Sequence, residues 1–286
     1  MELLQVKGLY KSYKKFKLQD ISFTLPKGYI MGYVGKNGAG KTTTLNLITH
    51  LCHAEAGQIT LNGLSYDEKP NLYKEMIGYV GDESYFPQEL KVKDIGGILK
   101  NFYPTFRNER WNELLKQWQL PTNQKVKEYS RGMKVKLMFA AALSRDTKLL
   151  ILDEATNGLD PVVRSEILKL LQEYIEDGEK SILFSTHILN DLEQIADYII
   201  LIDEGRIILQ DTKDELLESY VLIKGDSKEL PDNLKQHLMG VEYGEYGCSA
   251  ILSTEYVEQI PRSFVIDQPT IDQIMVANIK RGRNVK

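Results

Sequence analysis

The amino-acid sequence predicts an α/β fold built on a mainly parallel, doubly wound sheet. Short apolar runs of strand length, at residues 29–34, 149–152, 182–184 and 198–202, alternate with segments of helical periodicity. The first of these runs leads through a glycine-rich turn into a helical segment. Strands that alternate with helices form parallel sheets, because each connecting helix packs across a face of the sheet.

The first third of the chain contains most of the expected strands. Residues 18–25 alternate apolar and polar side chains, which predicts a strand with one buried face. Residues 29–34 are apolar throughout, which predicts a strand covered on both faces. A helix is expected at about residues 41–51, and further strands are expected at residues 58–61 and 77–80.

From about residue 82 to residue 145 the pattern changes to helices. Trp111, Leu114, Leu115 and Trp118 follow the i, i+3, i+4, i+7 spacing of one apolar helix face. This spacing predicts that both tryptophans serve helix packing. The segment is therefore expected to be a helical insertion into the α/β sheet.

The pattern weakens after about residue 210. Residues 221–223 and 263–266 are strand candidates, and a last helix is expected from Thr270, because Thr270 and Gln273 have the spacing of a capping box. We therefore expect a large domain at residues 1–212 and a small accessory domain at residues 213–286. The basic tail at residues 280–286 is expected to be a solvated terminus, with contact to lipid headgroups as the alternative.

The composition excludes several classes of protein. Hydrophobic residues make up 42% and charged residues 27% of the 286 residues, as in a globular protein and unlike a disordered one. The net charge of −4 argues against a protein that grips nucleic acid through a broad basic surface. Two cysteines, Cys52 and Cys248, make no disulfide framework and indicate a reducing cytosol. No signal peptide and no membrane-spanning run of about 20 apolar residues is expected.

The glycine-rich turn fits the pattern G-x-x-x-x-G-K-[ST] of a P-loop. Its backbone N–H groups can curl around phosphate oxygens, and the following helix adds partial positive charge. Lys41 is expected to reach the β- and γ-phosphates, and the Thr42 hydroxyl is expected to bind Mg²⁺. The expected nucleotide-binding residues of this loop are Gly35, Lys36, Asn37, Gly38, Ala39, Gly40, Lys41, Thr42 and Thr43.

Two carboxylates follow the apolar strand at residues 149–152. A buried strand that delivers an acid at its C-terminal edge is how P-loop proteins hold Mg²⁺ near the P-loop threonine. Asp153 is therefore expected to bind the metal, and Glu154 is expected to be the base that orients or activates water.

Tyr129, Ser130, Arg131, Gly132 and Met133 precede an apolar helix upstream of this strand. Ser130 is a favourable N-cap residue, and the free N–H groups that follow it form a second helix end that favours phosphate. The segment resembles the signature motif of the ABC ATPase family, which is usually Leu-Ser-Gly-Gly-Gln.

Further landmarks of the family appear in the same order along residues 1–212. The segment Thr156-Asn157-Gly158-Leu159-Asp160-Pro161 is similar to the D-loop, and His187, after the strand at residues 182–184, is similar to the switch histidine at the γ-phosphate. Tyr13 matches the aromatic residue that stacks on adenine, with an ordinary surface tyrosine as the alternative.

The resemblance implies a P-loop NTPase (RecA-like) core with a helical ABC subdomain at about residues 82–145. It implies that Lys41, Glu154 and His187 are catalytic. It also implies that Ser130, Arg131, Gly132 and Met133 contact ATP in trans across a dimer.

The sequence departs from the family pattern at two places. Arg131 and Met133 replace the glycine and glutamine that the signature usually carries. The Q-loop, expected after the strand at residues 77–80, has Asp82 where a glutamine is usual, and we assign Asp82 as the Mg²⁺ ligand in preference to the later Gln88.

The function implied by the resemblance is ATP hydrolysis coupled to export, with ATP and Mg²⁺ as cofactors. The expected partners are a second ABC ATPase subunit, identical or different, and an ABC-2-type permease as in bacitracin-resistance-like and peptide-toxin exporters; no nucleic acid is expected. The expected location is cytoplasmic, on the inner face of the cell membrane through the permease. Soluble ABC ATPases of translation or chromosome maintenance, and a nucleotide sensor without turnover, are the alternatives.

Overall fold

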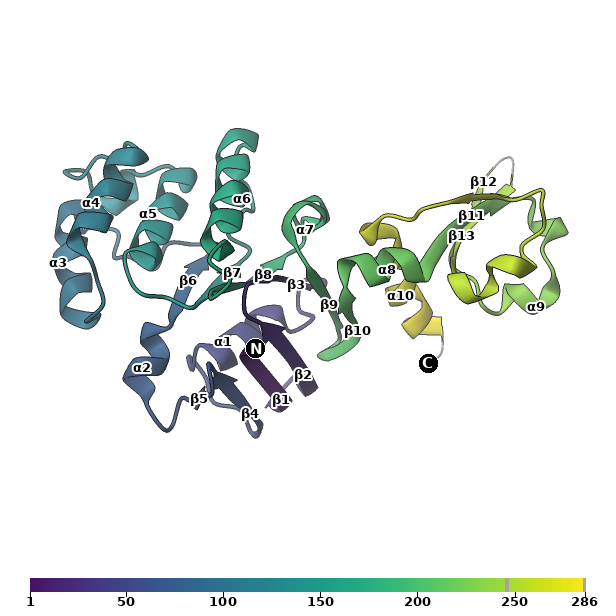
Figure 1. The fold of residues 1–286 in the computed structure, drawn as a ribbon, viewed down its shortest axis with the longest axis horizontal. Coiled ribbons are helices and arrows are strands. Elements are labelled where there is room, and N and C mark those ends of the chain that lie inside the picture. Colours follow the sequence, from purple (N-terminus) through teal and green to yellow (C-terminus); the bar gives the residue numbers. More distant parts are fainter. Residues whose placement is uncertain (245–246, 285–286) are drawn as a thin grey trace.

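The centre of the computed structural model, which describes residues 1–244 and 247–284, is a six-stranded sheet with the order β10-β9-β3-β8-β7-β6 (Figure 1). The neighbouring pairs are parallel from β9 through β3, β8 and β7 to β6. The edge strand β10 runs antiparallel to β9. The predicted mainly parallel α/β fold is therefore confirmed. The strands are β3 (Ile30–Val34), β6 (Ile77–Gly81), β7 (Leu149–Asp153), β8 (Ser181–Thr186), β9 (Tyr198–Asp203) and β10 (Arg206–Thr212).

A second, antiparallel sheet has the order β2-β1-β4-β5. One hydrophobic core joins the buried side chains of this sheet to those of helix α1 and of β3, because their apolar faces leave water together. The elements are β1 (Glu2–Tyr13), β2 (Phe16–Pro26), β4 (Ala56–Leu61), β5 (Leu64–Ser65) and α1 (Lys41–Ile48).

Helix α1 ends earlier than the sequence pattern predicts. The apolar spacing continues to Leu51, whereas the helix ends at Ile48 with Thr49 as its C-cap. His50 has a φ of 55°, which is left-handed and incompatible with a continued α-helix.

The segment between β6 and β7 is helical, as predicted, and lies at one end of the molecule (Figure 1). Trp111, Leu114 and Leu115 of α4 are buried in a core shared with α3, α5 and α6, so the predicted packing role of this face is confirmed. The helices are α2 (Pro70–Glu75), which precedes β6, α3 (Val92–Phe102), α4 (Asn108–Gln117), α5 (Arg131–Leu143), and after β7 α6 (Pro161–Ile175) and α7 (Leu189–Ile195).

The C-terminal part forms a four-stranded antiparallel sheet at the opposite end (Figure 1). Thr270 and Gln273 form the predicted capping box, and the Ile271 N–H donates to Glu193 at 3.0 Å, which ties the last helix to α7. Val285 and Lys286 of the basic tail lie outside the described residues. The elements are α8 (Lys213–Ser219), β11 (Tyr220–Gly225), α9 (Asp232–Lys235), β12 (Met239–Gly244), β13 (Gly247–Ser253), β14 (Val265–Asp267) and α10 (Ile271–Asn284).

Within the residues described, none of the helices combines the length and apolar character needed to cross a membrane.

Candidate functional site

The P-loop connects β3 to α1, in the context that the sequence predicts. Gly40 precedes α1 with a φ of 118°, which side chains rarely adopt. Gly35 has another reason to be glycine, because a Cβ there would lie 2.4 Å from the carbonyl oxygen of Ile202. The two glycines let the loop turn tightly against β9. The first N–H groups of α1 then converge on one place, where a phosphate could bind.

Lys41 is the first residue of α1, and its side chain is only 5% exposed. Its Nζ donates to the carbonyl oxygen of Gly35 at 2.7 Å, so the lysine folds back over the P-loop. The same Nζ lies 3.3 Å from Oε1 of Glu154. Because an unpaired buried ammonium group is costly, Glu154 serves as the counter-ion of Lys41 within the chain.

Asp153 is the last residue of β7 and is 7% exposed. Its Oδ1 is buried without a hydrogen-bond partner among the described residues. Burial raises the pKa of the Asp153 carboxyl above its ordinary value, and the nearby Thr42 hydroxyl acts in the opposite direction. A buried carboxylate oxygen is costly unless a hydrogen-bond donor or a cation satisfies it. Asp153 and the Thr42 hydroxyl therefore fit a Mg²⁺ site.

Glu154 and His187 meet at the same edge of the sheet. The Nδ1 atom of His187, the first residue after β8, lies 2.6 Å from Oε2 of Glu154. The backbone of Glu154 has a φ of 54°, and its N–H donates to the carbonyl oxygen of Ser185 at 2.9 Å. Strained backbone of this kind is typical of functional sites, where the surroundings hold it. Lys41, Glu154 and His187 thus converge from three distant segments of the chain.

The signature segment caps α5. The Oγ of Ser130 accepts from the Met133 N–H at 3.3 Å, so Ser130 is the N-cap, as predicted. Arg131 forms an ion pair with Asp82, which follows β6. Gly132 faces Val163 of α6, whose side chain lies 3.5 Å from the position of an added Cβ.

The remaining predicted residues are Asp160, Tyr13 and Asp82. The contacts that the structure shows for them are with groups other than Lys41, Glu154 and His187. Asp160 caps α6, accepting from the N–H groups of Val162 and Val163 at 3.1 and 3.0 Å. Tyr13 lies at the end of β1 with about half of its surface exposed, and the Nζ of Lys11 lies 5.7 Å from the centre of its ring. Its predicted stacking on adenine stays a prediction. The contact that the structure shows for Asp82 is the ion pair with Arg131, and its predicted role as a Mg²⁺ ligand stays a prediction.

Tyr79 is a site residue that the sequence interpretation missed. Its hydroxyl lies 3.5 Å from Oδ2 of Asp153, across neighbouring strands β6 and β7. Burial, followed by the charge of Asp153, raises the pKa of Tyr79 to about 12, so the hydroxyl stays protonated. The sequence signal for Tyr79 was its position near the C-terminal end of the predicted strand at residues 77–80. That strand could pair with the strand that carries Asp153.

A buried ionic network was also missed. Asp191 of α7 is 1% exposed and accepts from the Thr156 hydroxyl at 2.8 Å and from Arg164 Nε of α6 at 2.6 Å. The network connects the D-loop to α6 and to the helix that follows His187.

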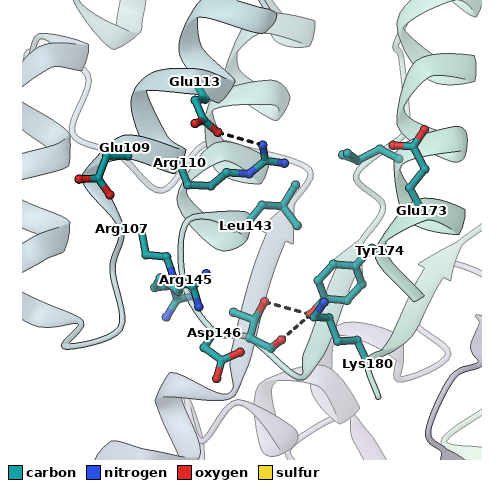
Figure 2. A pocket seen from close by; sticks show the side chains of 12 residues that line it. Arg107, Glu109, Arg110, Glu113, Leu143, Arg145, Asp146, Glu173, Tyr174 and Lys180 are labelled. Carbon is teal, nitrogen blue, oxygen red and sulfur yellow. Dashed lines mark hydrogen bonds and ion pairs between the residues drawn. The ribbon is translucent and has the colours of Figure 1, made fainter. Parts of the chain in front are cut away.

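A separate cavity of about 500 Å³ lies between α4, the C-terminal end of α5 and α6 (Figure 2). None of the predicted ATP-site residues lines it. Its four basic and four acidic side chains balance, and Arg110 pairs with Glu113 at 3.3 Å, so the cavity offers no charge preference for a nucleotide. The lining residues are Arg107, Glu109, Arg110, Glu113, Leu143, Arg145, Asp146, Thr147, Leu170, Glu173, Tyr174 and Lys180.

Comparison with known proteins agrees with this geometry. The family model described as ABC transporter matches residues 18–157. The chain is 33% identical over 207 residues to the ABC transporter ATP-binding protein YtrB of Bacillus subtilis, covering 72% of this chain and 70% of that protein. It is 32% identical over 242 residues to the lantibiotic transport ATP-binding protein SrtF of Streptococcus pyogenes, covering 78% of this chain and 99% of the relative.

A solved structure of an ATP-binding subunit of an ABC transporter has a TM-score of 0.69 and 28% identity to this chain. The match covers 75% of this chain and 91% of the solved one. The similarity therefore extends over most of the solved subunit, in sequence as well as in fold.

Proposed function

Because the chain belongs to the ABC transporter family, as an ATP-binding subunit that hydrolyses ATP, we propose that it dimerises on ATP and powers an export permease. The observation that carries the proposal is the convergence of Lys41, Glu154 and His187 beside the P-loop. The neighbouring Asp153 carries the buried oxygen that suits a cation.

Each of these groups has a task in phosphoryl transfer to water, which depends on positioning and charge stabilisation. The N–H groups of the P-loop and Lys41 would bind the phosphates, and Thr42 and Asp153 would hold Mg²⁺, with Asp82 as a further proposed ligand. When bound, Mg²⁺ would supply positive charge that stabilises the phosphate oxygens. Glu154 orients the attacking water and accepts its proton. The Nδ1 atom of His187 lies 2.6 Å from Glu154 and holds the carboxylate in place. We propose that the same ring contacts the γ-phosphate.

We propose that the second half of each ATP site comes from another subunit. Ser130 caps α5 in the helical part, the segment between β6 and β7, whereas Lys41 begins α1 beside the central sheet. The two helix N-termini that can bind phosphate therefore belong to different parts of the chain. In a face-to-face dimer, the Ser130–Met133 segment of one subunit would close the site that the P-loop of the other subunit opens. Tyr13, at the end of β1, would stack on the adenine.

An apolar groove of about 400 Å³ supports a permease as partner. It lies between the sheet core and the helical part, and Tyr79 lines it together with Leu51, Tyr85, Leu99 and Tyr103. Leu51 is largely exposed and Tyr85 is half-exposed, as suits side chains that a partner covers. Because Tyr79 also contacts Asp153, a permease segment in this groove would lie one side chain from the metal-binding carboxylate.

The relative SrtF is a lantibiotic transport protein by name, which favours an exporter of peptides or related compounds and a permease of the ABC-2 type. The location that follows is the cytoplasmic face of the membrane, through the permease. The membrane-spanning part is assigned to the permease.

The test is co-expression with candidate ABC-2-type permeases from the same genome, followed by purification in mild detergent. We expect a stable complex whose ATPase activity changes with the permease and is lost in the Glu154→Gln variant. Hydrolysis without capture of any permease would favour a soluble ATPase of translation or chromosome maintenance. ATP binding without turnover would favour a nucleotide sensor.

A further inference from the structure

Two of the three positions at which the sequence departs from the family pattern, Asp82 and Arg131, contact each other. Asp82 follows β6 of the core sheet, and Arg131 is the first residue of α5 in the helical part. Their ion pair joins the two parts of the chain. The side chains of Asp82 and Arg131 are 46% and 42% exposed, so the pair is open to exchange with other charged groups.

Arg131 also lies against the D-loop. A Cβ added at Gly158 would lie 3.4 Å from the Nε of Arg131. The guanidinium group therefore lies between the segment after β6 and the segment after β7.

A nearby anion stabilises Arg131 at the start of a helix. A cation at a helix N-terminus is disfavoured by the positive end of the helix dipole, and the first turn of α5 contains no acidic residue. Asp82, from another element, supplies the missing negative charge. An exposed pair of this kind contributes up to about 1 kcal/mol, which is weak enough for a more highly charged anion to replace it.

We propose that Asp82 competes with the phosphates of the partner subunit's ATP for Arg131. The inference rests on the proposed dimer, in which the Ser130–Met133 segment closes the other subunit's site. While Asp82 holds Arg131, the start of α5 is charge-compensated within its own chain and attracts phosphate less. When ATP phosphates take Arg131, Asp82 is released and becomes free for the Mg²⁺ role predicted for it. Asp82 thus sets the ATP concentration at which two subunits close.

A purely structural tie between the core and the helical part is the competing explanation. The charge swap Asp82→Arg with Arg131→Asp separates the two. The swap rebuilds an ion pair within the chain, but it places a carboxylate where the partner's phosphates arrive. If Arg131 exchanges between Asp82 and the partner's phosphates, the swapped protein should have the wild-type melting temperature and still fail to dimerise. A structural tie, in which Arg131 makes no contact with the partner's phosphates, predicts that the swap recovers both the melting temperature and dimerisation.

The experiment measures ATP-dependent dimerisation by sedimentation velocity in a Glu154→Gln background, at saturating Mg²⁺, over a range of ATP concentrations. We expect Asp82→Asn to lower the midpoint ATP concentration about two- to fivefold, because an exposed ion pair no longer has to break. Arg131→Gln should raise it. Glu83→Gln removes the same charge one residue away and should leave the midpoint unchanged.

An unchanged or raised midpoint in Asp82→Asn, or dimerisation by the charge swap, would overturn the inference while the proposed dimer stands. If the Glu154→Gln parent forms no dimer at any ATP concentration, the proposed dimer itself is wrong and the inference falls with it.

Discussion

Replacing Arg164 with methionine should destabilise the fold by breaking the buried network around Asp191. Arg164 contacts Oδ1 of Asp191 through Nε at 2.6 Å and Nη2 at 2.5 Å. Asp191 is 1% exposed, so the variant leaves a buried carboxylate with the Thr156 hydroxyl as its remaining hydrogen-bond donor. Breaking a buried pair costs about 3–5 kcal/mol. Arg164 is 27% exposed and Thr156 stays, so we expect about 2–3 kcal/mol.

A chain of this size should then lose roughly 4–10 °C of melting temperature, measured by calorimetry or near-ultraviolet circular dichroism. Lys169→Met is the matched control, because it removes an exposed ion pair with Glu173 on the same helix, at 3.8 Å. Its effect should stay below about 0.5 kcal/mol. Adding Asp191→Asn to Arg164→Met removes the unpaired charge and should recover much of the loss. A melting temperature of Arg164→Met within 1 °C of wild type would refute this energetic account of the network.

Three further predictions concern the ATP site. Glu154→Gln should bind ATP and slow turnover at least tenfold, measured by phosphate release; near-wild-type turnover would remove Glu154 from the role of base. Asp82→Ala should weaken the Mg²⁺ dependence of turnover far more than Gln88→Ala, and the reverse ranking in a Mg²⁺ titration would place the Q-loop ligand at Gln88. Mixing inactive Lys41→Ala and Ser130→Arg proteins should restore ATP-dependent dimerisation, because one site of the mixed dimer is intact; no recovery, while wild type homodimerises, would contradict the assignment of Ser130 in trans.

The parts of the fold that the sequence predicted are those that local chemistry determines. The strand at residues 29–34 could be predicted because every side chain is apolar, and the structure buries all of β3. The P-loop could be predicted because its glycines, its lysine and the following helix are adjacent in sequence. Strand β12 was missed because it contains Gly240, at a φ of 60°, and its register with β13 is irregular.

The contacts that were missed depend on tertiary packing. Asp82 and Arg131 belong to elements whose proximity follows from the way α5 packs against β6. The same holds for Asp191 and Thr156, which meet only because α7 folds back beside the D-loop. A single sequence shows the charge of each residue, but not which opposite charge the fold brings to it.

The two cations proposed to bind phosphates share an electrostatic arrangement. Lys41 is paired with Glu154, and Arg131 is paired with Asp82, so each cation has a carboxylate as its counter-ion within the chain. In each pair the carboxylate is also the group for which we propose another task, on water for Glu154 and on Mg²⁺ for Asp82. ATP phosphates that take over the two cations would release both carboxylates for those tasks. Binding of ATP would then assemble the hydrolytic site in the same step, because the phosphates replace the two carboxylates as partners of the cations. Removal of the Glu154 charge should therefore leave the affinity for ATP equal or higher while it stops turnover.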